Sequence, residues 1–362
     1  MTRGKELAAR TALVVASVVM GLVLLELGYR LAKETLSLLQ ELDHADTPAL
    51  AHWAIPDPLL GFVPRPGGIS RNGPFDDDGF RLAPAMVPAN PGLVVATGDS
   101  FTLGEEVAND ETWPAILQEL TGVRVINAGV SAYGIDQTVL RTERLAATLA
   151  PTAMVVGFIA DDIWRTEMRR LWDRKKPYFV GDGGVLVLQA VAEPATETGS
   201  ASSLWDLLRQ SALVNVVLGG LAVLDDWRYS HNEWLGDNVR ALPSGSGEEI
   251  SCALMHRLAE AGVPILVVAQ YDLNFWARGP NHLAELRRQS LMVLGCASAA
   301  GLATLDTFGM LKEAIRHSGL HSLYLQDHHS AFGNGLVAQS IAEALTVRGM
   351  LKVPMQRPRN SP

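Results

Sequence analysis

The feature that most constrains the fold is an alternation of short apolar runs with amphipathic stretches, which begins at residue 93. The apolar runs predict strands at 93–96, 124–127, 153–158, 264–269 and 303–306. The amphipathic stretches predict helices at 111–121, 137–149, 250–261 and 284–300. Strands that alternate with helices form βα units, whose strands pair in parallel. We therefore expect an α/β fold of three layers, α/β/α, with a parallel sheet of about five strands.

Composition permits a large core and excludes one class of partner. Apolar residues make up 48% of the 362 residues and charged residues 19%, so extensive disorder is not expected. The net charge of −9 argues against a nucleic-acid partner, because phosphates require a basic surface.

Neither the nine histidines nor the two cysteines show the spacing of a metal site, so we expect no metal. Cys252 and Cys296 both lie in segments that predict helices. Two separate buried thiols are the simpler interpretation of this pair. A disulfide between them is the alternative.

An uncharged apolar segment, Thr11–Leu25, lies near the N-terminus, and its apolar character resumes past Glu26. The resulting span of about 19 residues is long enough to cross a bilayer as a helix. Arg3, Lys5 and Arg10 precede it. By the positive-inside rule, these residues keep the N-terminus cytoplasmic and place the main domain outside, in the periplasm or at the cell surface. No clear cleavage site follows, so we expect an uncleaved membrane anchor over residues 1–33. A soluble protein with an apolar first helix is the alternative.

Proline and composition divide the rest of the chain. Frequent prolines predict an irregular stalk and lead-in over residues 34–90. The main domain is expected at 91–350, with an insertion at 163–248. Residues 351–362 are expected to form a disordered tail. The insertion contains a predicted hairpin at 178–188 and a long apolar helix at 204–224. In the lead-in, the acidic run Asp76–Asp78 is interpreted as a loop before a turn glycine rather than as a cation site.

Polar residues follow several of the predicted strands. The first strand leads into Ser100, the second into Gly129 and the third into Asp161. The segment Asp327-His328-His329 precedes the last predicted helix. Ligands of open parallel sheets bind at the carboxyl ends of the strands, so serine, glycine, acid and histidine are expected to meet at one edge.

The segments around these residues resemble blocks I, II, III and V of the SGNH (GDSL-type) hydrolase superfamily, in the right order. They read GDSFTLG (98–104), INAGVSAYG (126–134), FIADDI (158–163) and DHHSAFGNGLVA (327–338). The upstream NGPFDDDGFR (72–81) resembles the lead-ins of membrane-anchored members related to polysaccharide O-acetyl esterases and transferases. The resemblance implies an SGNH-hydrolase-like fold and no metal or organic cofactor.

The resemblance also implies catalytic roles. Ser100 would be the nucleophile, which needs a histidine base held by a carboxylate. The positive end of the following helix would assist Ser100. The backbone N–H groups of Ser100 and Gly129 would form the oxyanion hole, and a side chain at Gly129 would crowd the substrate.

Block III departs from the family pattern. The family usually carries an asparagine whose side chain donates to the oxyanion, and Asp161 takes that position here. An ionised carboxylate only accepts hydrogen bonds. Either Asp161 is protonated in a buried site, or another donor such as Asn127 or the Trp164 ring N–H replaces it.

The base is identified by spacing. Members of the family typically carry a glycine five residues after the catalytic histidine. Gly333 therefore indicates His328 as the base. His329 is the alternative, because Asp327 and His329 have the Asp-x-His spacing that puts both on one side of an extended segment. Asp327 is the expected orienting acid in either case, and a Ser-His dyad without an acid is a further alternative.

These roles imply a serine esterase that hydrolyses small, acetyl-like acyl esters through an acyl-serine intermediate. Its partners would be an ester or acylated carbohydrate of the cell envelope and, through the N-terminal helix, the membrane. An O-acyltransferase that uses the same acyl-enzyme is one alternative. A non-catalytic binding or assembly module of the envelope is the other.

Overall fold

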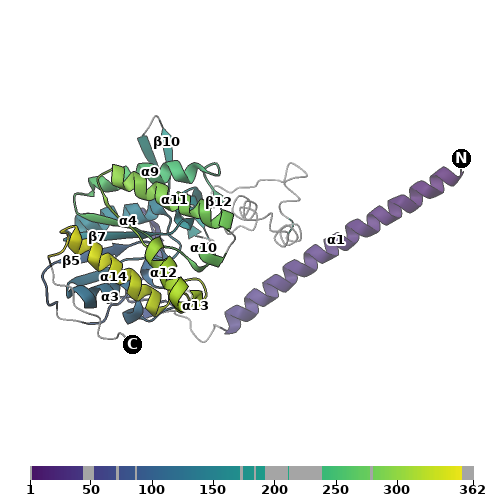
Figure 1. Ribbon diagram of the computed structural model, residues 1–362. Coiled ribbons are helices and arrows are strands. Elements are labelled where there is room, and N and C mark those ends of the chain that lie inside the picture. Colours follow the sequence, from purple (N-terminus) through teal and green to yellow (C-terminus); the bar gives the residue numbers. More distant parts are fainter. Residues whose placement is uncertain are drawn as a thin grey trace. The chain divides into compact units, whose positions relative to one another are not determined.

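Five parallel strands form the central sheet of the computed structural model (Figure 1). They are β5 (Leu93–Thr97), β6 (Arg124–Asn127), β7 (Ala153–Phe158), β13 (Ile265–Ala269) and β14 (Ala303–Asp306). The strand order is β14-β13-β7-β5-β6, and each neighbouring pair is parallel. The predicted parallel sheet is therefore confirmed.

The structure describes residues 2–43, 53–70, 73–85, 88–171, 174–182, 185–191, 211, 239–277 and 280–352. They fall into two compact units. The smaller unit comprises Met1–Pro48 and Pro194–Val239, and the larger comprises Ala49–Glu193 and Arg240–Pro362. The sheet lies in the larger unit. The predicted helix at 204–224 and the last ten residues of the predicted tail, 353–362, lie outside the described residues.

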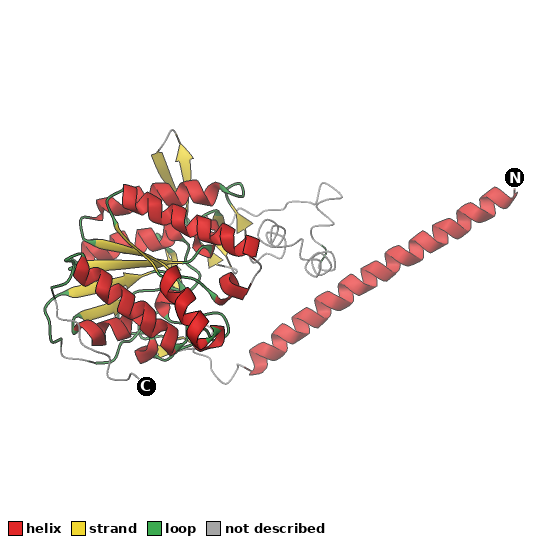
Figure 2. Cartoon of the chain, in the orientation of Figure 1, coloured by secondary structure: helices red, strands yellow, loops and turns green. Residues whose placement is uncertain are grey.

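Helices cover both faces of the sheet and complete the three layers (Figure 2). One face carries α4 (Ile135–Leu149), α9 (Ser246–Leu258) and α11 (Pro280–Ala299). The other carries α3 (Trp113–Thr121), α12 (Phe308–Ser318), α13 (Leu320–Leu323) and α14 (Ala331–Val347). Strands β7 and β13 are buried along their whole length, as expected for a parallel sheet covered on both faces.

The described residues also form shorter elements. The helices among them are α2 (Ser100–Leu103), η2 (Asn109–Glu111), α5 (Asp161–Arg165), η4 (Ala259–Ala261) and α10 (Leu273–Ala277). The strands are β1 (Ala54–Asp57), β2 (Gly61–Pro64), β3 (Ile69–Ser70), β4 (Gly73–Pro74), β8 (Met168–Leu171), β9 (Arg174–Lys175), β10 (Tyr178–Asp182), β11 (Val185–Gln189) and β12 (Val239–Arg240). Strands β10 and β11 form the predicted hairpin.

The end of β5 lies at the point where the strand order of the sheet reverses. The chain runs from β5 to β6 on one side and then to β7 on the other side of β5. Connections that leave on opposite sides open a crevice at the carboxyl end of the sheet, where open α/β sheets bind ligands. Ser100 follows β5 directly and therefore lies at this crevice.

In the smaller unit, α1 (Thr2–Asp43) is one continuous helix. Its segment Arg10–Ala32 has 23 residues, a mean hydropathy of 2.2 and no burial, so it is a candidate membrane span by length and composition. Glu26 forms an ion pair with Arg30 at 2.7 Å, which reduces the cost of a charge in an apolar segment. The helix continues through residues 34–43, which were expected to be irregular, because the chain between Tyr29 and Pro48 contains no proline or glycine.

The described part of the lead-in from residue 53 onward belongs to the larger unit and is held there by polar contacts. Asp57 pairs with Arg144 of α4 at 2.7 Å. The Gln137 side chain of α4 donates to the Leu60 carbonyl at 2.8 Å. Further along, Asp76 accepts the N–H groups of the residues two and four positions later, so the acidic run forms a turn as expected.

Cys252 of α9 and Cys296 of α11 form a disulfide, with 5.2 Å between their Cα atoms. The expectation of two separate thiols is therefore wrong. The cysteines meet because α9 and α11 pack side by side on the same face of the sheet. That pairing depends on the whole fold and has no local sequence signal.

We expect the bridge to stabilise the larger unit by about 2–4 kcal/mol, because it closes a loop of 44 residues in the unfolded chain. Unfolded, unreduced protein should contain no reactive thiol. The Cys252→Ser/Cys296→Ser double variant should unfold at a lower urea concentration. Two reactive thiols in the unreduced protein would contradict the bridge.

Candidate active site

The turn after β5 presents Ser100. Gly98 has φ of 154°, and an added Cβ would lie 2.2 Å from the Thr102 hydroxyl, so only glycine fits there. Asp99 caps α2, since its carboxylate accepts the N–H of Phe101 at 3.0 Å. Ser100 is thereby fixed at the first position of α2. This helix has only four residues, so the assistance expected from its positive end is small.

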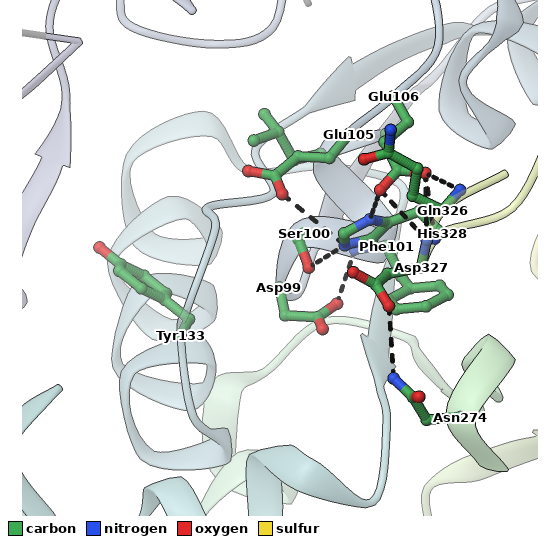
Figure 3. A network of polar contacts seen from close by, with 12 residues as sticks. Asp99, Ser100, Phe101, Glu105, Glu106, Tyr133, Asn274, Gln326, Asp327 and His328 are labelled. Carbon is green, nitrogen blue, oxygen red and sulfur yellow. Dashed lines mark hydrogen bonds and ion pairs between the residues drawn. The ribbon is translucent and has the colours of Figure 1, made fainter. Parts of the chain in front are cut away.

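His328 lies beside Ser100 (Figure 3). Its Nε2 is 2.8 Å from the serine Oγ, and its ring packs on Phe101 with 4.8 Å between centroids. Ser100 is 7% exposed and His328 is half-buried. A neutral imidazole at this distance accepts the hydroxyl proton, which is the geometry of a general base and its nucleophile.

Glu106 occupies the place that the sequence assigned to Asp327 (Figure 3). Its Oε1 is 2.9 Å from Nδ1 of His328. The same carboxylate accepts the backbone N–H groups of Gln326 at 2.9 Å, Asp327 at 3.3 Å and His328 at 3.4 Å. Glu106 therefore holds both the imidazole ring and the loop that carries it.

This contact changes the pKa values of both partners. Burial alone would raise the pKa of Glu106, but the hydrogen bond and charge of His328, with the N–H groups of Asp327 and His328, lower it to about 2. Burial alone would lower the pKa of His328, but the Glu106 hydrogen bond and the charges of Glu105 and Glu106 raise it above 6.5. Glu105 contributes to the raised pKa of His328, and its Oε2 lies 3.7 Å from Nε2 of that ring. The ionised Glu106 thus stabilises the imidazolium that forms when His328 accepts a proton.

Asp327 and His329 lie elsewhere. Asp327 is exposed, and its carboxylate accepts a hydrogen bond from Asn274 at 3.3 Å (Figure 3). Neighbouring side chains diverge in an extended loop, so Asp327 does not reach the ring of His328. His329 is 1% exposed and packs edge-on against Phe101. Burial and the charge of His328 lower the pKa of His329 to about 3.

Gly129 is required by packing. An added Cβ would lie 2.2 Å from the Leu103 nitrogen, so it would collide with the backbone of α2. The Gly129 N–H donates to the Asn127 side chain at 3.1 Å, and the Asn127 amide donates to the Leu103 carbonyl at 3.2 Å. The Asn127 side chain thereby links the turn after β6 to α2. The Ser100 N–H, at the start of α2, has no acceptor within the helix and lies next to the hydroxyl.

Asp161 begins α5 and is half-buried, and the second candidate donor, Trp164, lies half-buried on the same helix. The buried acid of this segment is Asp162, which pairs with Arg165 at 2.6 Å. Arg165 also lies 3.8 Å from Asp99. Burial and the charge of Asp99 raise the pKa of Asp162, while Arg165 opposes the shift. The role assigned to Asp161 stays a prediction.

The residue that sequence reasoning missed is Glu106. It lies shortly after the turn that carries Ser100, so a search for acids at the carboxyl edge of the sheet includes it. No spacing links it to His328, which lies 222 residues further along the chain. Its backbone has φ of 72°, an uncommon value for a residue other than glycine, and such values are more frequent at functional sites than elsewhere. Among the described residues, no group of histidine, cysteine or acidic side chains fits a metal ion.

Comparison with known proteins finds no matching family model and no matching curated protein. Solved structures that resemble the chain include LAE5, an alpha/beta hydrolase from the metagenome of Lake Arreo, at 14% identity and a TM-score of 0.44, covering 74% of this chain and 98% of that one. A lipolytic protein of the G-D-S-L family from Veillonella parvula matches at 13% identity and a TM-score of 0.41, covering 70% of this chain and 98% of that one. Axe2, an acetylxylan esterase from Geobacillus stearothermophilus, matches at 13% identity and a TM-score of 0.43, covering 72% of this chain and 96% of that one. Likeness at this level carries no inference about activity.

The titration of His328 tests the geometry directly. Nuclear magnetic resonance of the histidine rings in the full chain should give His328 a midpoint above 6.5. Glu106→Gln should lower this midpoint, because the imidazolium loses its charged partner. Asp327→Asn is the matched control and should leave the midpoint unchanged. The assignment is wrong if Asp327→Asn lowers the midpoint as much as Glu106→Gln.

Proposed function

We propose that the chain is a membrane-anchored serine esterase that hydrolyses small, uncharged acyl esters through an acyl-Ser100 intermediate. The observation that carries the proposal is the series of contacts from Glu106 to His328, 2.9 Å, and from His328 to Ser100, 2.8 Å. A serine hydroxyl is a weak nucleophile unless a base removes its proton. An ionised carboxylate behind the base stabilises the positive charge that the base acquires.

In the proposed reaction, Nε2 of His328 takes the Ser100 proton as Oγ attacks the ester carbonyl. The Ser100 N–H donates to the oxyanion of the tetrahedral intermediate. The imidazolium then gives its proton to the departing alcohol, which leaves the acyl group on Ser100. Water repeats the sequence with His328 as base, and the carboxylic acid leaves as Ser100 is restored.

The acidic surroundings of Ser100 favour a substrate without negative charge near the scissile bond. The carboxylates of Glu105 and Glu106 both lie within 4 Å of the His328 ring nitrogens, so an anionic acyl group would be repelled. An acetyl-like ester of a cell-envelope carbohydrate satisfies this condition. The motif resemblance of residues 72–81 to lead-ins of O-acetyl esterases supports the same substrate class.

We place the larger unit outside the cytoplasm. The basic residues before the apolar part of α1 favour a cytoplasmic N-terminus. The Cys252–Cys296 disulfide supports the same orientation, because disulfides persist in the periplasm and at the cell surface but are rare in the cytosol.

A fluorophosphonate probe tests the proposal. We expect it to label the detergent-solubilised full chain at Ser100, and the protein to hydrolyse p-nitrophenyl acetate. Ser100→Ala should abolish labelling, and His328→Ala should slow hydrolysis by at least about 10³-fold.

His329→Phe is the control, because it keeps an aromatic ring in the core and should retain labelling. Folded wild-type protein without labelling would contradict the proposal. So would loss of labelling in His329→Phe together with its retention in His328→Ala.

A further inference from the structure

We propose that Arg81, in the lead-in, is a positioning residue that holds the loop 103–107 in the conformation from which Glu106 reaches His328. The inference rests on the proposed esterase function for its catalytic consequence. Its structural part concerns the Glu106–His328 contact and stands apart from that function.

Arg81 bonds to both ends of the loop. Its Nη1 donates to the carbonyls of Leu103 at 3.4 Å and Gly104 at 3.1 Å, and its Nη2 donates to the carbonyl of Val107 at 2.8 Å. Its Nε donates to the Asn109 side chain at 2.6 Å. The residues between these carbonyls are Glu105 and Glu106. One planar guanidinium therefore spans the segment that carries the acid, a geometry that the single ammonium of lysine does not reproduce.

The loop needs such a restraint. Glu106 has φ of 72°, in the left-handed region that non-glycine residues adopt only when their surroundings impose it. Buried carbonyls also need donors, and Arg81 supplies them from a side chain that is 2% exposed. Burial lowers the pKa of Arg81 to about 10, so it remains charged at neutral pH.

The lead-in fixes Arg81 in turn. The turn formed by Asp76 reverses the chain, and Phe75 and Arg81 form a bridge across it. The Arg81 N–H then donates to the Asn127 carbonyl at the end of β6, at 3.0 Å. The side chain of Asn127 bonds to the Leu103 carbonyl that Arg81 also contacts. The segment 73–81 thus packs against the edge strand β6 and brings the Arg81 guanidinium to the loop 103–107.

The test measures the pKa of His328 and the hydrolysis of p-nitrophenyl acetate in Arg81→Gln. Loss of a nearby cation would by itself raise the pKa of His328. Loss of Glu106 positioning would lower it, so the sign distinguishes the two. We expect the midpoint to fall towards that of Glu106→Gln, and kcat to fall about 10- to 100-fold with little change in KM. In the Glu106→Gln background, Arg81→Gln should reduce kcat little further.

Arg144→Gln is the matched control, because it breaks another contact of the lead-in, to Asp57, without touching the loop. It should leave the His328 midpoint and kcat unchanged. If Arg81→Gln does not fold, Arg81→Lys keeps the charge and should also lower the midpoint, since it cannot span both ends of the loop.

An unchanged or raised His328 midpoint in a folded Arg81 variant would overturn the proposal, as would equal losses of kcat in Arg81→Gln and Arg144→Gln. Absence of hydrolysis by the wild type would refute the esterase function alone, because the His328 midpoint still reports on Arg81.

Discussion

The carboxylate of Glu106 joins two parts of the chain that lie 222 residues apart, and the candidate active site depends on it. One oxygen faces the His328 ring, and the group as a whole accepts three successive backbone N–H groups from the loop 326–328. An acid with these partners sets the direction of the imidazole as well as its pKa. Without it, burial would favour the neutral ring and the loop would lose its shared acceptor.

The fold brings this carboxylate to the right place in successive steps. The sheet order puts the end of β5 at the crevice, and Gly98 and Asp99 shape the turn that begins α2. Gly129 lets the β6 turn approach the backbone of α2 closely. Arg81 and Asn127 then donate hydrogen bonds to carbonyls at the C-terminal end of α2, so the lead-in and the sheet edge together shape the loop. These groups are buried, and most of them act on backbone atoms that side-chain spacing in the sequence does not reveal.

The sequence was sufficient for the sheet, since each of the five predicted strands matches an observed strand to within one residue at either end. It also selected His328 over His329, and the structure places His328 beside Ser100. It failed where the answer depends on loop conformation: Asp327 is adjacent to His328 in sequence yet points to Asn274, whereas Glu106 is distant in sequence and lies in contact. The disulfide was only the alternative expectation for a similar reason, because the distance between α9 and α11 is a property of the packed fold.

The most direct test is whether Ser100 becomes acylated, and at what rate. Rapid mixing with p-nitrophenyl acetate, followed by mass spectrometry of the peptide that contains Ser100, measures acyl transfer apart from later steps. If Glu106 orients His328, Glu106→Gln slows acylation by about 10²- to 10⁴-fold, while Asp327→Asn is acylated as fast as the wild type. Equal acylation by Glu106→Gln and the wild type, or a slow Asp327→Asn, would contradict this role of Glu106.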